Sequence, residues 1–219
     1  MRMIFRFVVL FLMSTSYNML AQPFSAFTNI RQEFYVFDNG AIHKIEPLQP
    51  VDYKVGRRAV AYLDNARNFK VYQDGTVTKI NDLFTTQFTV SDNLVLFRSA
   101  NMISVIDGND VVLLSKLCDR YAMGDSVVLY YDINQSTFNG YYNGQITELE
   151  TFLNIDQNDF RFDSTVKVSD NIGAYINFNS QFKVFYNNHS EVIESQPPRD
   201  FHVGRNTVAY VDINNIFKI

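Results

Sequence analysis

The sequence predicts an all-β protein made of repeated antiparallel units, and three observations lead to this fold class. One short phrase recurs five times, turn residues recur at one phase of the same period, and no segment shows sustained helical spacing of apolar residues. The copies open at Val55, Val90, Met123, Val168 and Val203, so their spacings are 35, 33, 45 and 35 residues. A period in this range marks a repeat architecture.

Residues 51–82 show the predicted elements of one unit. Its second run is continuously apolar, which is typical of a strand covered on both faces. The pair Asp74-Gly75 favours a tight hairpin turn because both positions need positive φ. The predicted pieces are, in order, a run ending at Val55, the turn Gly56-Arg57, the strand 59–63, a polar loop, the strand 69–73, the Asp74-Gly75 turn and the strand 76–80.

The same turn chemistry recurs in the other copies, at Asp38-Asn39-Gly40, Asp107-Gly108, Asn143-Gly144 and Asn187-Asn188. Four antiparallel strands per unit of this length are the signature of a β-propeller, in which each blade buries its faces against its neighbours. We therefore predict a propeller of about five blades. The predicted units lie near 51–82, 86–117, 120–150 and 164–195, with the fifth formed by 200–219 together with 34–46.

The unit also resembles the blades of TolB-like and related WD40-like propellers. In that family a turn is followed by I-A-Y-like residues, then I-Y-V-like residues, then Asp-Gly. The matching residues here are Ala61-Tyr62, Phe69 to Tyr72, Asp74-Gly75, Ala209-Tyr210 and Phe217. The resemblance implies a propeller and leaves the ligand open.

Two ways of closing the ring stay open. Residues 34–46 match the last two strands of a unit, and the copy from Phe201 stops early in its third strand, so one blade could be completed from both termini. However, Phe34 to Phe37 and Ile216 to Ile219 both look like the third strand. The alternative is an incomplete, truncated ring that continues past Ile219.

The N-terminus predicts a secretory signal peptide over residues 1–21, followed by a linker over 22–33. Arg2 and Arg6 precede an apolar stretch at 7–13, and Ala21 suits the last position before cleavage. The apolar stretch is too short to cross a bilayer. We therefore expect a secreted or periplasmic protein without a membrane span after cleavage.

Composition narrows the function classes. A net charge of -4 gives no basic footprint for nucleic acid. The only cysteine, Cys118, lies in an apolar stretch and is expected to be a buried thiol. No motif predicts a cofactor, a metal site or a catalytic residue.

Two sets of residues at equivalent positions, and one insertion, are candidate binding sites. The first set ends the second strands and should form a polar ring, although Asp and Asn at such places also bond their own turns. The second set lies in the first turns, on the opposite face, where paired carboxylates could act as acid and base. The insertion at 151–163 could form a contact surface. The candidates are Asp64, Arg98, Asp132, Asn177 and Asp212 in the ring, Arg57, Asp92, Asp125, Asp170 and Arg205 in the first turns, and Phe152, Asp156, Asp159, Phe160 and Arg161 in the insertion.

The leading hypothesis is an exported, non-catalytic propeller that binds or scaffolds a protein, peptide or glycan. One alternative is a carbohydrate-binding or carbohydrate-active propeller, which several carboxylates converging in the central funnel would favour. Another is the N-terminal fragment of a larger exported propeller protein.

Overall fold

The computed structural model describes residues 24–80, 84–151 and 162–219. In these residues it contains six antiparallel sheets of three or four strands and one helix of four residues, α1 (Phe162–Thr165). The prediction of an all-β fold is thereby confirmed. This helix is far too short to cross a bilayer, so the described ranges contain no helix that could span a membrane.

The first three sheets follow the chain without crossovers. Their strands are β1 (Phe24–Thr28), β2 (Phe34–Asp38) and β3 (Ala41–Glu46) in the first, β4 (Asp52–Val55), β5 (Ala59–Leu63), β6 (Phe69–Gln73) and β7 (Thr76–Lys79) in the second, and β8 (Thr85–Val90), β9 (Leu94–Ser99), β10 (Met102–Asp107) and β11 (Asp110–Ser115) in the third.

The other three sheets repeat this order, and α1 precedes the fifth. Their strands are β12 (Cys118–Met123), β13 (Val127–Asp132), β14 (Thr137–Tyr142) and β15 (Gln145–Thr151) in the fourth, β16 (Val166–Ser169), β17 (Ile172–Ile176), β18 (Phe182–Tyr186) and β19 (His189–Glu194) in the fifth, and β20 (Asp200–Gly204), β21 (Thr207–Val211) and β22 (Phe217–Lys218) in the sixth.

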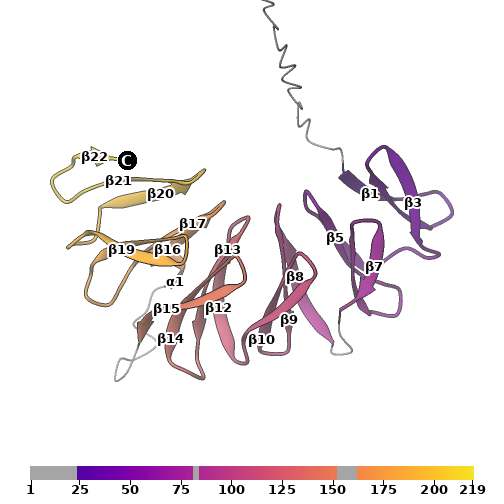
Figure 1. The fold of residues 1–219 in the computed structure, drawn as a ribbon, viewed down its shortest axis with the longest axis horizontal. Helices are drawn as coiled ribbons and strands as arrows, with labels where there is room; N and C mark the ends of the chain where they lie inside the picture. Colours follow the sequence, from indigo (N-terminus) through magenta and orange to yellow (C-terminus); the bar gives the residue numbers. More distant parts are fainter. Residues whose placement is uncertain (1–23, 81–83, 152–161) are drawn as a thin grey trace, which may run out of the picture.

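The sheets follow one another along an open arc, and the first and the last lie at its two ends (Figure 1). Neighbouring sheets pack most closely through their first and second strands, as β4 does with β8 and β13 does with β16. The second strands are the most buried, as their continuous apolar runs predicted: all five residues of β5 and all six of β13 are buried.

The hydrophobic core is divided into clusters, each shared by two neighbouring sheets. Phe69 and Val71 of the second sheet, for example, lie in one cluster with Phe88, Val95 and Phe97 of the third. Because each cluster takes half of its side chains from the next sheet, no sheet could bury its apolar faces alone.

Two predictions about the ends of the repeat were wrong. The segment 22–33 is not wholly a linker, because it contains β1, which pairs with β2 along its full length. The stretches 34–46 and 200–219 do not share a blade, because they belong to two separate sheets. Phe34 begins β2 and Phe217 begins β22, and by register both strands correspond to the third strand of a four-stranded sheet. The two residues therefore cannot occupy one blade. The described residues therefore hold six sheets rather than five.

The prediction for Cys118 was correct. Its thiol is buried between the third and fourth sheets, and burial raises its pKa to about 12. A thiol with this pKa is protonated at neutral pH and is a poor nucleophile.

Candidate functional site

The predicted polar ring places its members as expected in four of five sheets. Asp64, Asp132, Asn177 and Asp212 each follow or end a second strand, and all four are buried. Among the described residues, however, no hydrogen bond or ion pair joins one ring member to another. The ring is a set of separate side chains rather than one site.

Arg98 does not belong to this set. In the third sheet Arg98 pairs with Ile103, as Leu63 pairs with Phe69 in the second, so the position of Asp64 is taken by Ser99. The Arg98 guanidinium donates to the backbone oxygens of Cys118 and Asp119 at 2.7 and 3.2 Å, and so links the third sheet to the fourth.

The ring carboxylates are occupied by their own turns. The Oδ1 atom of Asp64 accepts the N–H groups of Ala66 and Asn68 at 2.9 and 2.8 Å. Asp212 accepts two N–H groups of its loop in the same way. The turn-forming interpretation of these residues therefore fits the structure better than a ligand-binding ring does.

Sequence reasoning missed a sixth member of the series. Asn29 follows β1, and its Oδ1 atom accepts the N–H groups of Arg31 and Glu33, both at 2.9 Å. The signal was present in the spacing, because an aromatic residue follows five positions after Asn29, as Phe69 follows Asp64. It was hidden because this copy lacks the opening phrase.

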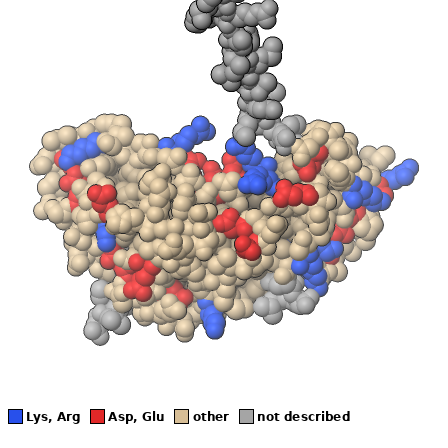
Figure 2. Space-filling model, viewed as in Figure 1, with Lys and Arg blue, Asp and Glu red and all other residues tan. Residues whose placement is uncertain are grey.

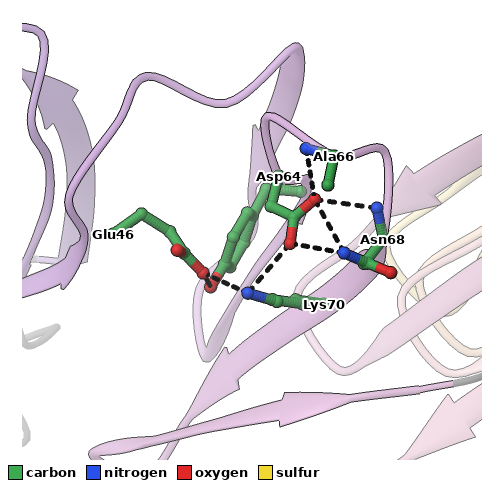
Figure 3. A network of polar contacts seen from close by, with 6 residues as sticks. Glu46, Asp64, Ala66, Asn68 and Lys70 are labelled. Carbon is green, nitrogen blue, oxygen red and sulfur yellow. Dashed lines mark hydrogen bonds and ion pairs between the residues drawn. The ribbon is translucent and has the colours of Figure 1, made fainter.

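A second contact type, also missed, joins neighbouring sheets through a lysine and a glutamate. Lys70 Nζ lies 2.6 Å from Glu46 Oε1 of the preceding sheet and 3.0 Å from Asp64 Oδ2 (Figure 3). The Tyr62 hydroxyl donates to the same Glu46 oxygen at 2.9 Å. We call each such lysine–glutamate pair across two sheets a Glu–Lys clamp. The three clamps of the described chain are Glu46–Lys70, Glu150–Lys183 and Glu194–Lys218.

The clamps shift the pKa values of their groups in the direction expected for stable ion pairs. Burial opposes ionisation of Asp64, but hydrogen bonds from Asn68 and Lys70 outweigh it and hold the pKa of Asp64 below its usual value. The hydrogen bonds from Lys218 and Tyr210 lower the pKa of Glu194 in the same way. These residues therefore stay charged and paired at neutral pH, which suits an architectural role.

The first turns, at the other end of the second strands, form a pocket. Turns of the second to fifth sheets enclose about 440 Å³, and three aspartates line this space: Asp92, Asp125 and Asp170. We call it the first-turn pocket. No lysine, arginine or histidine is among its described lining residues, although Arg57 Nη1 reaches to 4.0 Å from Asp92 Oδ2. On the face shown in Figure 2, acidic and basic side chains are interspersed.

Small residues bring these turns together. A Cβ atom at Gly124 would lie 2.7 Å from the backbone oxygen of Asp170, so only glycine allows the fourth and fifth sheets to approach this closely. Ser126 N–H donates to the same oxygen at 3.0 Å, and Ser91 Oγ donates to the oxygen of Asp125 at 2.9 Å. The aspartates are thus held by a chain of bonds from turn to turn.

The surroundings of Asp125 raise its pKa. Burial and a hydrogen bond with Asp170 raise the pKa of Asp125, and the nearby charge of Asp92 acts in the same direction.

The remaining predicted site residues belong to the insertion and to the sixth sheet. Phe152, Asp156, Asp159, Phe160 and Arg161 lie outside the described residues. Arg205 occupies the predicted first turn of the sixth sheet but is not among the residues that line the first-turn pocket. In the described part of the chain, no group of three or more His, Cys, Asp and Glu residues is arranged to hold a metal ion.

Comparison with known proteins gives a family and several similar folds. The family model described as "10-bladed beta propeller domain" matches residues 18–219. Hsv2p from Kluyveromyces lactis is 12% identical, with 84% of this chain and 67% of that chain covered and a TM-score of 0.40. Prp20p from Saccharomyces cerevisiae is 8% identical, with 88% and 68% covered and a TM-score of 0.43.

The CRINKLY WD40 ectodomain of the Arabidopsis thaliana receptor kinase ACR4 is 7% identical, with 88% of this chain and 74% of that chain covered and a TM-score of 0.40. No curated protein matches the chain. At these identities no function is transferred from the solved structures. The family match confirms the predicted propeller-repeat resemblance.

Proposed function

Because the chain belongs to the 10-bladed beta propeller domain family, we propose that it is an exported binding module without chemistry of its own. We further propose that its first-turn pocket takes a cationic group of a protein or peptide partner. The observation that carries this proposal is the convergence of Asp92, Asp125 and Asp170 on one pocket with no basic residue among its described lining.

The lining favours a cation over a sugar. Carboxylates form their strongest hydrogen bonds with ammonium and guanidinium groups. Sugar sites commonly add an aromatic ring for stacking, and the described lining residues include none.

The proposal is tested by titrating the protein with a fluorescent oligolysine peptide and with the same peptide acetylated on every lysine. We expect the cationic peptide to bind, the acetylated one not to bind, and the affinity to fall with added salt. The double variant Asp92→Asn, Asp170→Asn should lose about tenfold or more in affinity, which corresponds to about 1.4 kcal/mol. The matched control is Asp110→Asn, on an exposed outer hairpin. Equal binding by the double variant and the control would refute the proposal, and so would binding of a neutral oligosaccharide in place of the peptide.

Export rests on the N-terminal sequence. Arg2 and Arg6 before the apolar stretch 7–13, and Ala21 after it, support cleavage after residue 21. Expression of the full chain in a bacterial host, followed by mass measurement of the periplasmic product, should give a chain beginning at Gln22. A full-length product retained in the cytoplasm would contradict export.

A further inference from the structure

One position of the first turns carries a charged residue in four successive sheets. It is the second residue after the opening residue of each copy, so Arg57 follows Val55 as Asp92 follows Val90. The residues at this position are Arg57 in the second sheet, Asp92 in the third, Asp125 in the fourth and Asp170 in the fifth. The sheets follow one another along the arc (Figure 1), so the arginine stands at one end of the row of aspartates, next to Asp92.

Close packing of the turns holds the backbone of Arg57 at the edge of the first-turn pocket. Gly56 lines this pocket, and a Cβ atom at Gly56 would lie 2.2 Å from the backbone oxygen of Ser91, so only glycine allows this approach. Lys54 Nζ donates to the backbone oxygen of Phe88 at 2.7 Å and also joins β4 to β8. Because Arg57 directly follows Gly56, its side chain starts beside the pocket and next to the turn of the third sheet.

The side chain of Arg57 meets Asp92 in a long and exposed contact. Arg57 Nη1 lies 4.0 Å from Asp92 Oδ2, and the two side chains are 59% and 48% exposed. Water and salt screen a pair of this kind, so it is weak and can be exchanged for a pair with another cation. Asp125 and Asp170 differ from Asp92, because the described part of the chain places no lysine, arginine or histidine within 4.0 Å of their carboxylates.

We propose that Arg57 competes with the cationic group of the partner for Asp92 and thereby sets the affinity of the first-turn pocket. This inference rests on the proposed function, because it concerns the occupant of the same pocket. A cationic group that contacts Asp92 alone only replaces one cation by another and gains little. A group that also reaches Asp125 or Asp170 gains a carboxylate to which the described chain supplies no cation, and this gain allows it to displace Arg57.

The competition is measured by titrating variants of the 219-residue chain with the fluorescent oligolysine peptide at low ionic strength. Arg57→Met removes the competing charge, and we expect it to bind the peptide about threefold more tightly than Arg58→Met does, a gain in the range of an exposed ion pair. Arg58→Met is the matched control, because Arg58 is the adjacent residue, is exposed and forms no ion pair with a described carboxylate. Both variants lose one positive charge, so their overall attraction for the peptide changes equally. Thermal melts followed by circular dichroism verify that each variant is folded.

A second series of variants assigns the effect to Asp92. In the background Asp92→Asn, the gain of Arg57→Met over Arg58→Met should disappear, because the arginine then has no carboxylate to release. Equal affinities of Arg57→Met and Arg58→Met, or a gain that persists in the Asp92→Asn background, would overturn the competition while peptide binding itself still supports the proposed function. Failure of every variant and of the wild type to bind the peptide would overturn both.

Discussion

Aspartate serves two different purposes at the two ends of the second strands. At the end of β5, Asp64 is buried, and its carboxylate accepts two backbone N–H groups and forms an ion pair with Lys70. Its charge is therefore balanced by contacts within the fold. In the first turns, Asp125 and Asp170 face each other and share a hydrogen bond, with Asp92 close by. The same residue type is therefore architectural at one end, and at the other end it lines the pocket for which we propose a binding role.

At this scale the pH dependence of stability can be predicted from Asp125. Its raised pKa means that the folded state holds the proton more tightly than the unfolded chain does. The stabilisation is therefore complete below the ordinary aspartate pKa and is lost as the pH rises through the raised value. The variant Asp125→Asn should unfold at a higher temperature than the wild type at pH 7, and the difference should shrink as the pH is lowered. Thermal melts across this range measure it, with Asp110→Asn as control. A difference that grows towards low pH would contradict the assignment.

At the scale of elements, the Glu–Lys clamps tie the end of one sheet to the third strand of the next. Each glutamate comes from the last strand of its sheet, and each lysine directly follows the first residue of its own strand. Glu46, Lys70 and Asp64 are all largely shielded from solvent, so the contact is not a surface pair of negligible value. Among the described residues, such contacts join the first sheet to the second, the fourth to the fifth and the fifth to the sixth.

Removing one clamp should destabilise the fold measurably. Lys70→Met keeps most of the side-chain volume but leaves Glu46 and Asp64 without their cation, and we expect a loss of about 1–3 kcal/mol in the free energy of unfolding. Urea denaturation measures this value. Lys116→Met, at an exposed site, should change it by less than about 0.5 kcal/mol. If Lys70→Met has the same free energy of unfolding as the wild type, the clamp does not stabilise the fold.

The sequence alone predicted the strands whose bounds are set by adjacent turn residues. The strands 59–63 and 69–73 were predicted at the bounds observed for β5 and β6, because turn residues on both sides delimit each apolar run. The first-turn positions of Asp92, Asp125 and Asp170 could be predicted as equivalent for the same reason. Their convergence on one pocket depends on how the sheets stack, which the sequence does not encode locally.

Features that depend on distant pairing could not be predicted, whereas one error was avoidable. Ser99 lies nine residues after Val90, as Asp64 lies nine residues after Val55, so Arg98 was placed one position too late in the repeat, as the paired strands show. The clamp between Glu46 and Lys70 joins residues of two sheets, and only its recurrence with the same 24-residue separation at Glu194 and Lys218 hints at it. The strand β1 was missed because its copy lacks the opening phrase.

At the scale of the whole molecule, the arc has a centre and two ends. Among the described sheets, those in the middle have a neighbouring sheet on both sides, whereas the first and the sixth have one on a single side (Figure 1). Stability in such an array is roughly a sum of terms from each unit and from each junction. The end sheets therefore take part in one junction and the inner sheets in two.

Hydrogen exchange should reveal this gradient. We expect backbone amides of β9 and β13 to exchange most slowly and those of β1 to β3 and β20 to β22 fastest. The exchange of each segment is measured by mass spectrometry on the unaltered chain. Uniform protection along the chain would show that the array unfolds as a single unit.

The clamp has a genetic consequence as well. Because every clamp takes its acid from one repeat and its base from the repeat that follows, duplicating a segment of the gene in frame would deliver both halves of a new bond at once. Adding a repeat in this way requires no compensating substitutions in the other repeats. Duplication is thus one route by which propellers with different numbers of blades could descend from a shared ancestor.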